Sequence, residues 1–133
     1  MNKKRIASSR ITRLARNEVF VFGSNLQGLH GGGAAHFAYE HFGAEWGQGI
    51  GLHGQSYAIP TMQGGVETIK PYVDDFLQFA KVHSELDFLV TEIGCGIAGF
   101  SPKDIAPLFI PAIEDTRNVY LPESFYAVYG AIY

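Results

Sequence analysis

The sequence predicts a single α/β domain with a mixed, largely parallel sheet, because short apolar runs alternate with helical patterns along its 133 residues. Strands that alternate with helices of this length need crossover connections, which favour parallel neighbours. Hydrophobic residues make up 47% of the chain, which is ordinary for a globular domain with a core of its own. Neither a linker nor an internal repeat divides the chain, so we expect one domain over residues 1–133.

The first half of the chain contains two predicted strands and one predicted helix. Residues 19–22 (VFVF) form a β-branched and aromatic run that ends at a glycine, which is typical of a buried strand entering a turn. Apolar residues recur at helical spacing over residues 34–42, and a glycine follows them. Residues 46–55 are too rich in glycine for a regular element, whereas residues 56–59 (SYAI) predict a second strand that a proline stops.

The second half contains a long predicted helix and further strands. Apolar residues three and four positions apart predict an amphipathic helix that ends near His83. Because Pro71 fits a helix only in its first turn, this helix is expected to begin at Ile69 or Lys70. Residues 87–93 (DFLVTEI) predict a third strand, which again ends in glycines. The remaining predicted elements are a helix capped by Ser101 and Asp104, a strand over residues 118–121 and a terminal strand over residues 125–133.

Charge is distributed unevenly between the start of the chain and the rest of it. Six of the ten basic residues precede residue 17, and all thirteen acidic residues follow it, so the body of the chain is acidic. An acidic body repels a nucleic-acid backbone, and we therefore expect no nucleic-acid partner. The basic lead over residues 1–9 is expected to be a frayed, solvated terminus rather than a binding arm.

Membrane, secretion and metal signals are lacking in the sequence. No apolar run approaches the roughly 20 residues of a membrane span, and the opening residues have no apolar region of a signal peptide. A single cysteine forms no internal disulfide, so we expect a cytoplasmic protein without a membrane partner. The histidines at positions 30, 36, 41 and 53 match no standard zinc spacing, and we expect neither a metal ion nor another cofactor.

Glycine is concentrated in two turns, residues 23–35 (GSNLQGLHGGGAA) and residues 93–100 (IGCGIAGF), and each turn follows a predicted strand and precedes a predicted helix. Because ligands of open α/β sheets bind at the carboxyl ends of the strands, both turns should face the same side. Neither turn contains lysine or arginine, so an anion there would be held by backbone N–H groups at the helix starts. The sequence therefore predicts a phosphate-binding site, and the alternative is a pair of ordinary tight turns.

Two familiar phosphate motifs fit these turns poorly. Neither turn has the order G-x-x-x-x-G-K-[ST], which excludes a triphosphatase of the P-loop type. Residues 94–99 (GCGIAG) match G-x-G-x-x-G, but they come too late in the chain for the acidic residue and further units of a dinucleotide fold. The dinucleotide fold is therefore the minor interpretation.

The same segments, taken in order, resemble macro domains. The resemblance is carried by RITRL, FGSN, LHGGG, SYAIP and IGCGIAGFSP, which cover most of residues 10–109. These segments look most like those of a group of small macro-like proteins of bacteria and phages. Macro domains bind ADP-ribose and related molecules on a three-layer α/β/α fold, and some hydrolyse ADP-ribosyl linkages. The resemblance implies that fold and a small-molecule, ADP-ribose-like nucleotide ligand for this chain.

Carried over by position, the resemblance also implies roles for individual residues. Asn25 would contact the distal ribose, residues 31–34 would border that ribose and the phosphates, residues 94–99 would wrap the diphosphate, and Phe100 would pack against the distal ribose. The expected ligand-binding residues are Gly23, Ser24, Asn25, Gly31, Gly32, Gly33, Ala34, Gly94, Cys95, Gly96, Ile97, Ala98, Gly99 and Phe100.

Two departures from the macro-domain pattern limit what the resemblance implies. Arg10 stands where macro domains commonly carry the aspartate that reads the adenine amino group, so the base of the ligand stays open. Ala34 and Ala35 stand where some hydrolytic members carry an acidic residue, so that catalytic group is missing. Whether the protein is an enzyme is therefore left undecided.

Four residues are candidates for catalysis, each with a structural alternative. Asn25 orients a ribose hydroxyl or serves its own turn, and His30 contacts a phosphate or transfers a proton. Cys95 is a thiol activated by local dipoles or a small buried residue, and Glu92 is a general base or a structural residue. Three functions stay open: a binding module for ADP-ribose or a related nucleotide diphosphate, a hydrolase of ADP-ribosyl or nucleotide-phosphate linkages, and an interaction protein with a degenerate ligand site.

Overall fold

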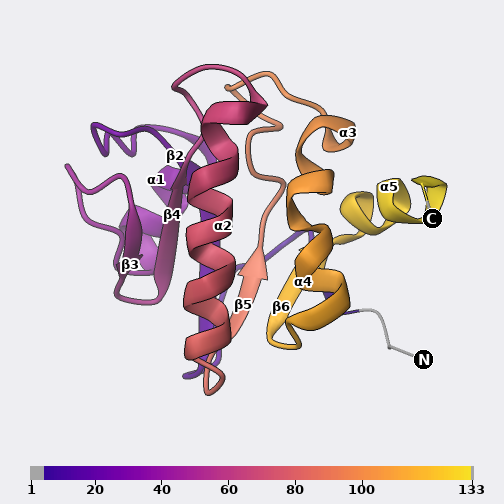
Figure 1. Cartoon of the computed structure of the whole chain (residues 1–133). Coiled ribbons are helices and arrows are strands. Elements are labelled where there is room, and N and C mark those ends of the chain that lie inside the picture. Colours follow the sequence, from indigo (N-terminus) through magenta and orange to yellow (C-terminus); the bar gives the residue numbers. More distant parts are fainter. Residues whose placement is uncertain (1–4, 133) are drawn as a thin grey trace.

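The computed structural model describes residues 5–132, in which six strands form one sheet (Figure 1). The strands are β1 (Ile6–Ala7), β2 (Glu18–Ser24), β3 (Gly51–His53), β4 (Ser56–Pro60), β5 (Asp87–Val90) and β6 (Val119–Pro122), in the spatial order β1-β6-β5-β2-β4-β3. Every neighbouring pair is parallel except β3 and β4, which are antiparallel. The predicted mixed, largely parallel sheet is thereby confirmed.

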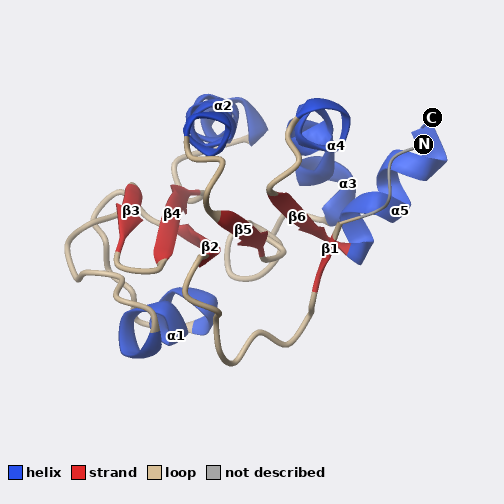
Figure 2. Cartoon of the chain, turned by 90° about the horizontal axis from the view of Figure 1, so that it is seen from below, coloured by secondary structure: helices blue, strands red, loops and turns tan. Residues whose placement is uncertain are grey.

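Helices cover both faces of this sheet, which makes the fold a three-layer α/β/α arrangement (Figure 2). The helices are α1 (Gly33–His41), α2 (Val66–Val82), α3 (Pro102–Ile105), the 3₁₀ helix η1 (Ala106–Phe109), α4 (Ile110–Asp115) and α5 (Glu123–Ile132). Helices α2, α3 and α4 lie on one face, α1 lies on the other, and α5 lies beside the edge strand β1. No helix of residues 5–132 combines the length and the apolar character needed to cross a bilayer.

The central strand β2 supplies both layers of the core. Successive side chains of a strand point to opposite faces, so Val19 and Val21 pack on the side of α2 while Phe20 and Phe22 pack on the side of α1. The α2 side is the larger cluster and contains Phe76 and the other fully buried aromatic side chains of that face. A strand covered on both faces explains why residues 19–22 are apolar without alternation.

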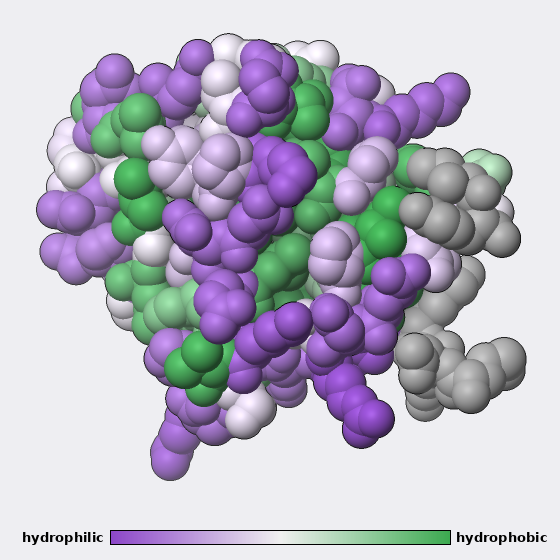
Figure 3. Space-filling model, in the orientation of Figure 1, coloured by the Kyte–Doolittle hydropathy of each residue, from purple (hydrophilic) through white to green (hydrophobic). Residues whose placement is uncertain are grey.

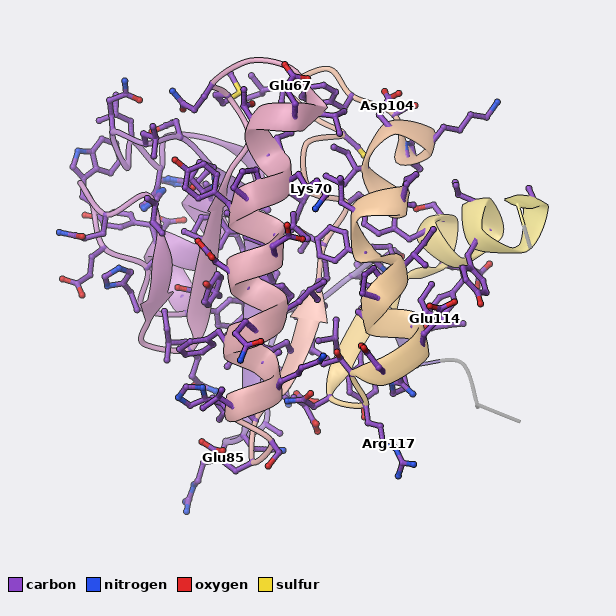
Figure 4. All side chains as sticks on the ribbon, viewed as in Figure 1. Glu67, Lys70, Glu85, Asp104, Glu114 and Arg117 are labelled. Atoms are coloured by element: carbon purple, nitrogen blue, oxygen red, sulfur yellow. The ribbon has the colours of Figure 1, made fainter. Side chains whose placement is uncertain are left out.

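The outer surface of the α2 face is polar. Hydrophilic side chains lie over the outward side of α2, and apolar side chains show between the helices (Figure 3). Among the charged residues of α2, Lys70 pairs with Asp74 at 2.7 Å. Acidic side chains lie at the starts of two helices, Glu67 on α2 and Asp104 on α3, at the same end of the molecule (Figure 4). Acidic groups there complement the positive ends of the helix dipoles.

Helix α2 begins earlier than expected. It starts at Val66, so Pro71 lies in its second turn rather than its first. The proline cannot donate the hydrogen bond that the carbonyl of Glu67 would accept. The start is fixed instead by Thr68, whose backbone N–H and side-chain hydroxyl both donate to the carbonyl of Gly65, at 2.9 and 2.6 Å. One missing bond is tolerated because the helix buries a full apolar stripe.

Three further expectations about the elements were wrong. The segment expected as a terminal strand is helix α5, in which the wholly buried Phe125 and the nearly buried Tyr126 complete the core. The expectation failed because a short apolar run does not distinguish a strand from a buried helix. Residue 133 lies outside the described residues. The third strand ends at Val90 and not at Ile93. The Thr91 N–H makes the last bond to β2, at the Val21 carbonyl, and the chain then turns, so that the Ile93 N–H bonds to the Thr91 carbonyl. The glycine-rich residues 46–55 contain the short strand β3.

The start of the chain is part of the sheet from Arg5 onward, contrary to the frayed lead expected over residues 1–9. Ile6 and Ala7 pair in parallel with β6, and Ala7 is buried. The guanidinium of Arg5 donates to the carbonyls of Ala112 and Thr116 at 3.3 and 3.0 Å, so a cation caps the carboxyl end of α4. Residues 1–4 lie outside the described residues.

Replacing Phe76 by alanine should destabilise the protein by about 3–5 kcal/mol, because its fully buried ring contacts the rings of Tyr57, Phe88 and Phe109. Urea unfolding followed by circular dichroism measures the change. The control Gln78→Ala removes an exposed side chain of the same helix and should stay within about 0.5 kcal/mol of the parent. Equal losses in the two variants would contradict this description of the core.

Candidate functional site

Two adjoining cavities lie where the parallel strands end. The larger has a volume of about 910 Å³ and the smaller about 210 Å³. Both are lined by Gly33, Ala34, Thr91, Glu92 and Gly96, so these five residues form a waist between them. The waist lies beside the ends of β2 and β5, at the edge of the sheet where the sequence placed the two glycine turns.

The two glycine turns face each other at this waist. A Cβ built on Gly32 would lie 3.9 Å from the side chain of Ile97, which belongs to the other turn. Gly33 and Gly94 have φ angles of +58° and +77°, a left-handed conformation that other residues adopt only with strain. Both turns therefore depend on glycine for their shape, and their backbones are open to a ligand.

The turn after β5 presents three consecutive backbone N–H groups without an acceptor. The N–H groups that flank them are used within the turn: Cys95 donates to Glu92 at 3.1 Å and Gly99 to Gly96 at 3.0 Å. Between them, the N–H groups of Gly96, Ile97 and Ala98 find no acceptor among the described residues. This run of free donors is a concave site suited to an anion.

The start of α1 presents a second set of free donors. The first three amides of a helix have no intrahelical acceptor, and here they belong to Gly33, Ala34 and Ala35. The residue that precedes the helix is Gly32, which has no side chain to cap them, and the first turn contains no acidic residue. Helices α2, α3 and α5 each carry an acidic side chain in that position. The α1 terminus is therefore open to an external anion.

The hydroxyl and amide side chains of the smaller cavity are already hydrogen-bonded to the backbone. The hydroxyl of Ser24 donates to the Gly49 carbonyl at 2.5 Å, and that of Thr91 donates to the Val21 carbonyl at 2.8 Å. Asn25 accepts from the Leu29 N–H at 2.8 Å and donates to the Leu29 carbonyl at 3.1 Å. Asn25 lines the cavity, yet its amide closes its own turn, which was the alternative role that the sequence left open.

His30 lies outside both cavities. Its ring is fully buried, and Nε2 donates to the carbonyls of Glu45 and Gln48 at 3.0 and 3.1 Å, while Nδ1 has no partner among the described residues. The buried ring therefore has no place on either cavity and does not support the phosphate contact or proton transfer expected of His30. The histidine instead fastens the segment around residues 45–48 to the first glycine turn.

Cys95 lines the larger cavity but is not an activated thiol. Burial raises its pKa from 9.0 to about 11, and the neighbouring carboxylates of Glu92 and Asp104 add to the rise. The expected lowering of the pKa by local dipoles is wrong, since burial and two negative charges act in the opposite direction. Cys95 fits its alternative role as a small, partly buried residue packed against the core.

Glu92 is the candidate that lies at the waist itself. It lines both cavities, and its Oε2 accepts a hydrogen bond of 2.6 Å from the hydroxyl of Ser124 in the first turn of α5. This bond ties the end of β5 to α5. One carboxylate oxygen, Oε1, is left without a partner among the described residues and is available to a hydroxyl or amino group of a ligand.

Three expected ligand residues do not line either cavity: Gly31, Gly99 and Phe100. Phe100 is half-buried and packs against the core on the α2 side, close to Gly94, so its expected contact with the distal ribose is not made by this conformation. The other expected residues line one or both cavities, namely Gly23, Ser24, Asn25, Gly32, Gly33, Ala34, Gly94, Cys95, Gly96, Ile97 and Ala98.

Sequence reasoning missed most of the larger cavity. Much of its lining comes from residues 8–12, which follow β1, and from residues 122–124, at the end of β6 and the start of α5. These two strand ends lie side by side because Ala7 pairs with Pro122. Because β1 has only two residues, no local sequence pattern predicts its pairing with β6. Sequence reasoning also missed Thr61 and Met62, which line the smaller cavity directly after β4. The predicted end of that strand at Pro60 could have indicated them, because ligands bind where parallel strands end.

Comparison of the chain with protein-family models, curated proteins and solved structures finds no match. The likeness to macro domains therefore rests on the sequence segments that carry it. Within residues 5–132 no three histidine, cysteine, aspartate or glutamate side chains are grouped to hold a metal ion.

The thiol of Cys95 should react slowly with iodoacetamide at pH 8 in the folded protein. A pKa of about 11 leaves about 100-fold less thiolate at that pH than the ordinary value of 9.0 would. The rate should rise as the pH increases toward 11 and should become fast at pH 8 only in urea. A reaction in the native protein that is half-maximal near pH 8 would contradict the burial of this thiol.

Proposed function

We propose that this chain binds ADP-ribose or a related nucleotide diphosphate, with the diphosphate at the waist between the two cavities. The observation that carries the proposal is a set of six backbone N–H groups without an acceptor, three from Gly33–Ala35 and three from Gly96–Ala98. All six belong to residues that line the smaller cavity, and three of these residues, Gly33, Ala34 and Gly96, form part of the waist. Such donors recognise phosphate oxygens without a basic side chain. No lysine or arginine lines the smaller cavity, so these amides account for the anion site there.

The shape of the site favours a ligand with its charge in the middle. A free phosphate would occupy the waist and leave both cavities empty, whereas a diphosphate that joins two larger groups fills all three spaces. The larger cavity, at about 910 Å³, lies within the range of small-molecule sites and has an apolar floor that includes Ile11, Phe20 and Phe37, which suits a nucleoside. The smaller cavity, at about 210 Å³, suits a sugar.

Binding is better supported than hydrolysis. Of the four candidate catalytic residues, Asn25 uses its amide in its own turn, His30 is buried away from the cavities, and the pKa of Cys95 is raised. Glu92 alone lies at the waist, where its free Oε1 is a hydrogen-bond acceptor. The open cavities also favour binding over the third alternative, a degenerate site, for which we expect the space between the turns to be filled.

A further carboxylate, placed in the first turn of α1, should weaken binding. Ala34 lines both cavities in the first turn of α1, so Ala34→Asp brings a negative charge to the free amides that the diphosphate needs. Because aspartate is favourable at the start of a helix, the variant should keep the fold. In calorimetric titrations with ADP-ribose, ADP, GDP and NAD, we expect the parent to bind at least one of them below millimolar concentration and Ala34→Asp to bind it at least about tenfold more weakly.

The matched control is Ala127→Asp, which adds the same charge on the exposed side of α5, away from both cavities. Its affinity should equal that of the parent. Failure of the parent to bind any of the four nucleotides at millimolar concentration would overturn the proposal. Equal weakening in the two variants would show that net charge, not the waist, controls binding.

A further inference from the structure

We propose that the base held in the larger cavity is guanine, read by Arg10 on one side and Glu123 on the other. The inference rests on the proposed function, because it assumes that the nucleoside half of a nucleotide diphosphate occupies this cavity. Arg10 and Glu123 both line the cavity, whose floor is apolar and whose near end is the waist. A base that extends from the waist along this cavity would come within reach of both charged residues.

The positions of Arg10 and Glu123 follow from the pairing of two edge strands. Ala7 of β1 pairs with Pro122 of β6, so the chain leaves both strands at the same level, and Glu123 is the next residue after Pro122. Beyond Ala7 the chain turns, and the backbone N–H of Arg10 donates to the hydroxyl of Ser8 at 3.0 Å. This turn places Arg10 on the same cavity as Glu123.

Neither charge has a protein partner. Among the described residues, no carboxylate lies within 4.0 Å of the Arg10 guanidinium and no cation lies within 4.0 Å of Glu123, and the two side chains make no hydrogen bond. Arg13, Arg16, Lys103 and Arg117 likewise form no salt bridge among the described residues, but Arg10 and Glu123 differ from them in lining the same cavity. Two unpaired opposite charges on one cavity fit a ligand that offers acceptors to the first and donors to the second.

Guanine offers a pair of adjacent acceptors and a pair of adjacent donors, whereas adenine offers neither pair. Guanine presents two acceptors, O6 and N7, that match the planar fork of an arginine, and it presents N1–H and N2–H donors that match a carboxylate. Adenine would turn its N6 amino group toward the guanidinium and the lone pair of N1 toward the carboxylate. Both contacts would bring like groups together, and each wrong contact lowers affinity.

The test compares GDP, ADP and IDP by calorimetry on the parent and on three variants. The parent should bind GDP about tenfold or more tightly than ADP, and IDP, which lacks the N2 amino group, should fall between them. Arg10→Gln should remove most of the preference for GDP over ADP, because a glutamine amide matches N6 and N7 of adenine while Glu123 still opposes its N1. Glu123→Gln should weaken both GDP and IDP and reduce the preference for GDP over IDP, because a single amide oxygen replaces the carboxylate that accepts from N1–H and N2–H.

The control variant is Arg13→Gln, which removes an exposed arginine of the same segment that lines neither cavity, and it should retain the preference for GDP. If Arg10 instead held a phosphate, Arg10→Gln would weaken GDP and ADP equally, and the inference would be overturned. Equal affinities for GDP and ADP in the parent, or a preference for ADP, would also overturn it while leaving the proposed nucleotide site intact. Failure of GDP, ADP and ADP-ribose alike to bind would overturn both proposals.

Discussion

Parallel pairing of β2 with its two neighbours is the constraint on which the rest of the structure depends. Because β4 and β5 both run parallel to β2, their carboxyl ends lie side by side, and the segments that leave them meet at one edge of the sheet. The first glycine turn leaves β2, and the second leaves β5. Without this pairing, the free amides at the start of α1 and those of Gly96–Ala98 would belong to separate surfaces.

A waist made of backbone donors has a physical consequence for selectivity. Amides held by glycine turns cannot move toward a ligand as long side chains do, so they favour an anion of fixed size and position. Because these amides contact only the phosphates, the rest of the ligand must be recognised in the two cavities on either side of the waist. In this chain the hydroxyl and amide side chains of the smaller cavity bond to the backbone, whereas Arg10 and Glu123 on the larger cavity have no partner among the described residues. Discrimination between nucleotides is thus expected at the larger cavity.

The α/β class, the buried strand at residues 19–22 and the two glycine turns could be predicted because their signals are local: apolar runs, helical spacing and clustered glycines. The structure adds what depends on distant residues. Strand β1 exists because Arg5 and Ala7 find partners more than a hundred residues away, so the lead that looked frayed borders the larger cavity. His30 looked like a loop residue, yet its ring is buried and hydrogen-bonds to two carbonyls that lie fifteen and eighteen residues further along the chain. Residues 125–133 were misread because burial permits an apolar helix as readily as an apolar strand.

The central claim, that backbone amides of two turns hold a diphosphate, is tested most directly by following the backbone N–H resonances in a two-dimensional ¹⁵N–¹H spectrum during titration with ADP-ribose. The largest shifts should belong to Gly33, Ala34, Ala35, Gly96, Ile97 and Ala98, the amides that have no acceptor in the free protein. Amides of α2 and α4, on the opposite face of the sheet, should shift little. Saturable shifts confined to α2 and α4, with the six amides unmoved, would contradict the claim.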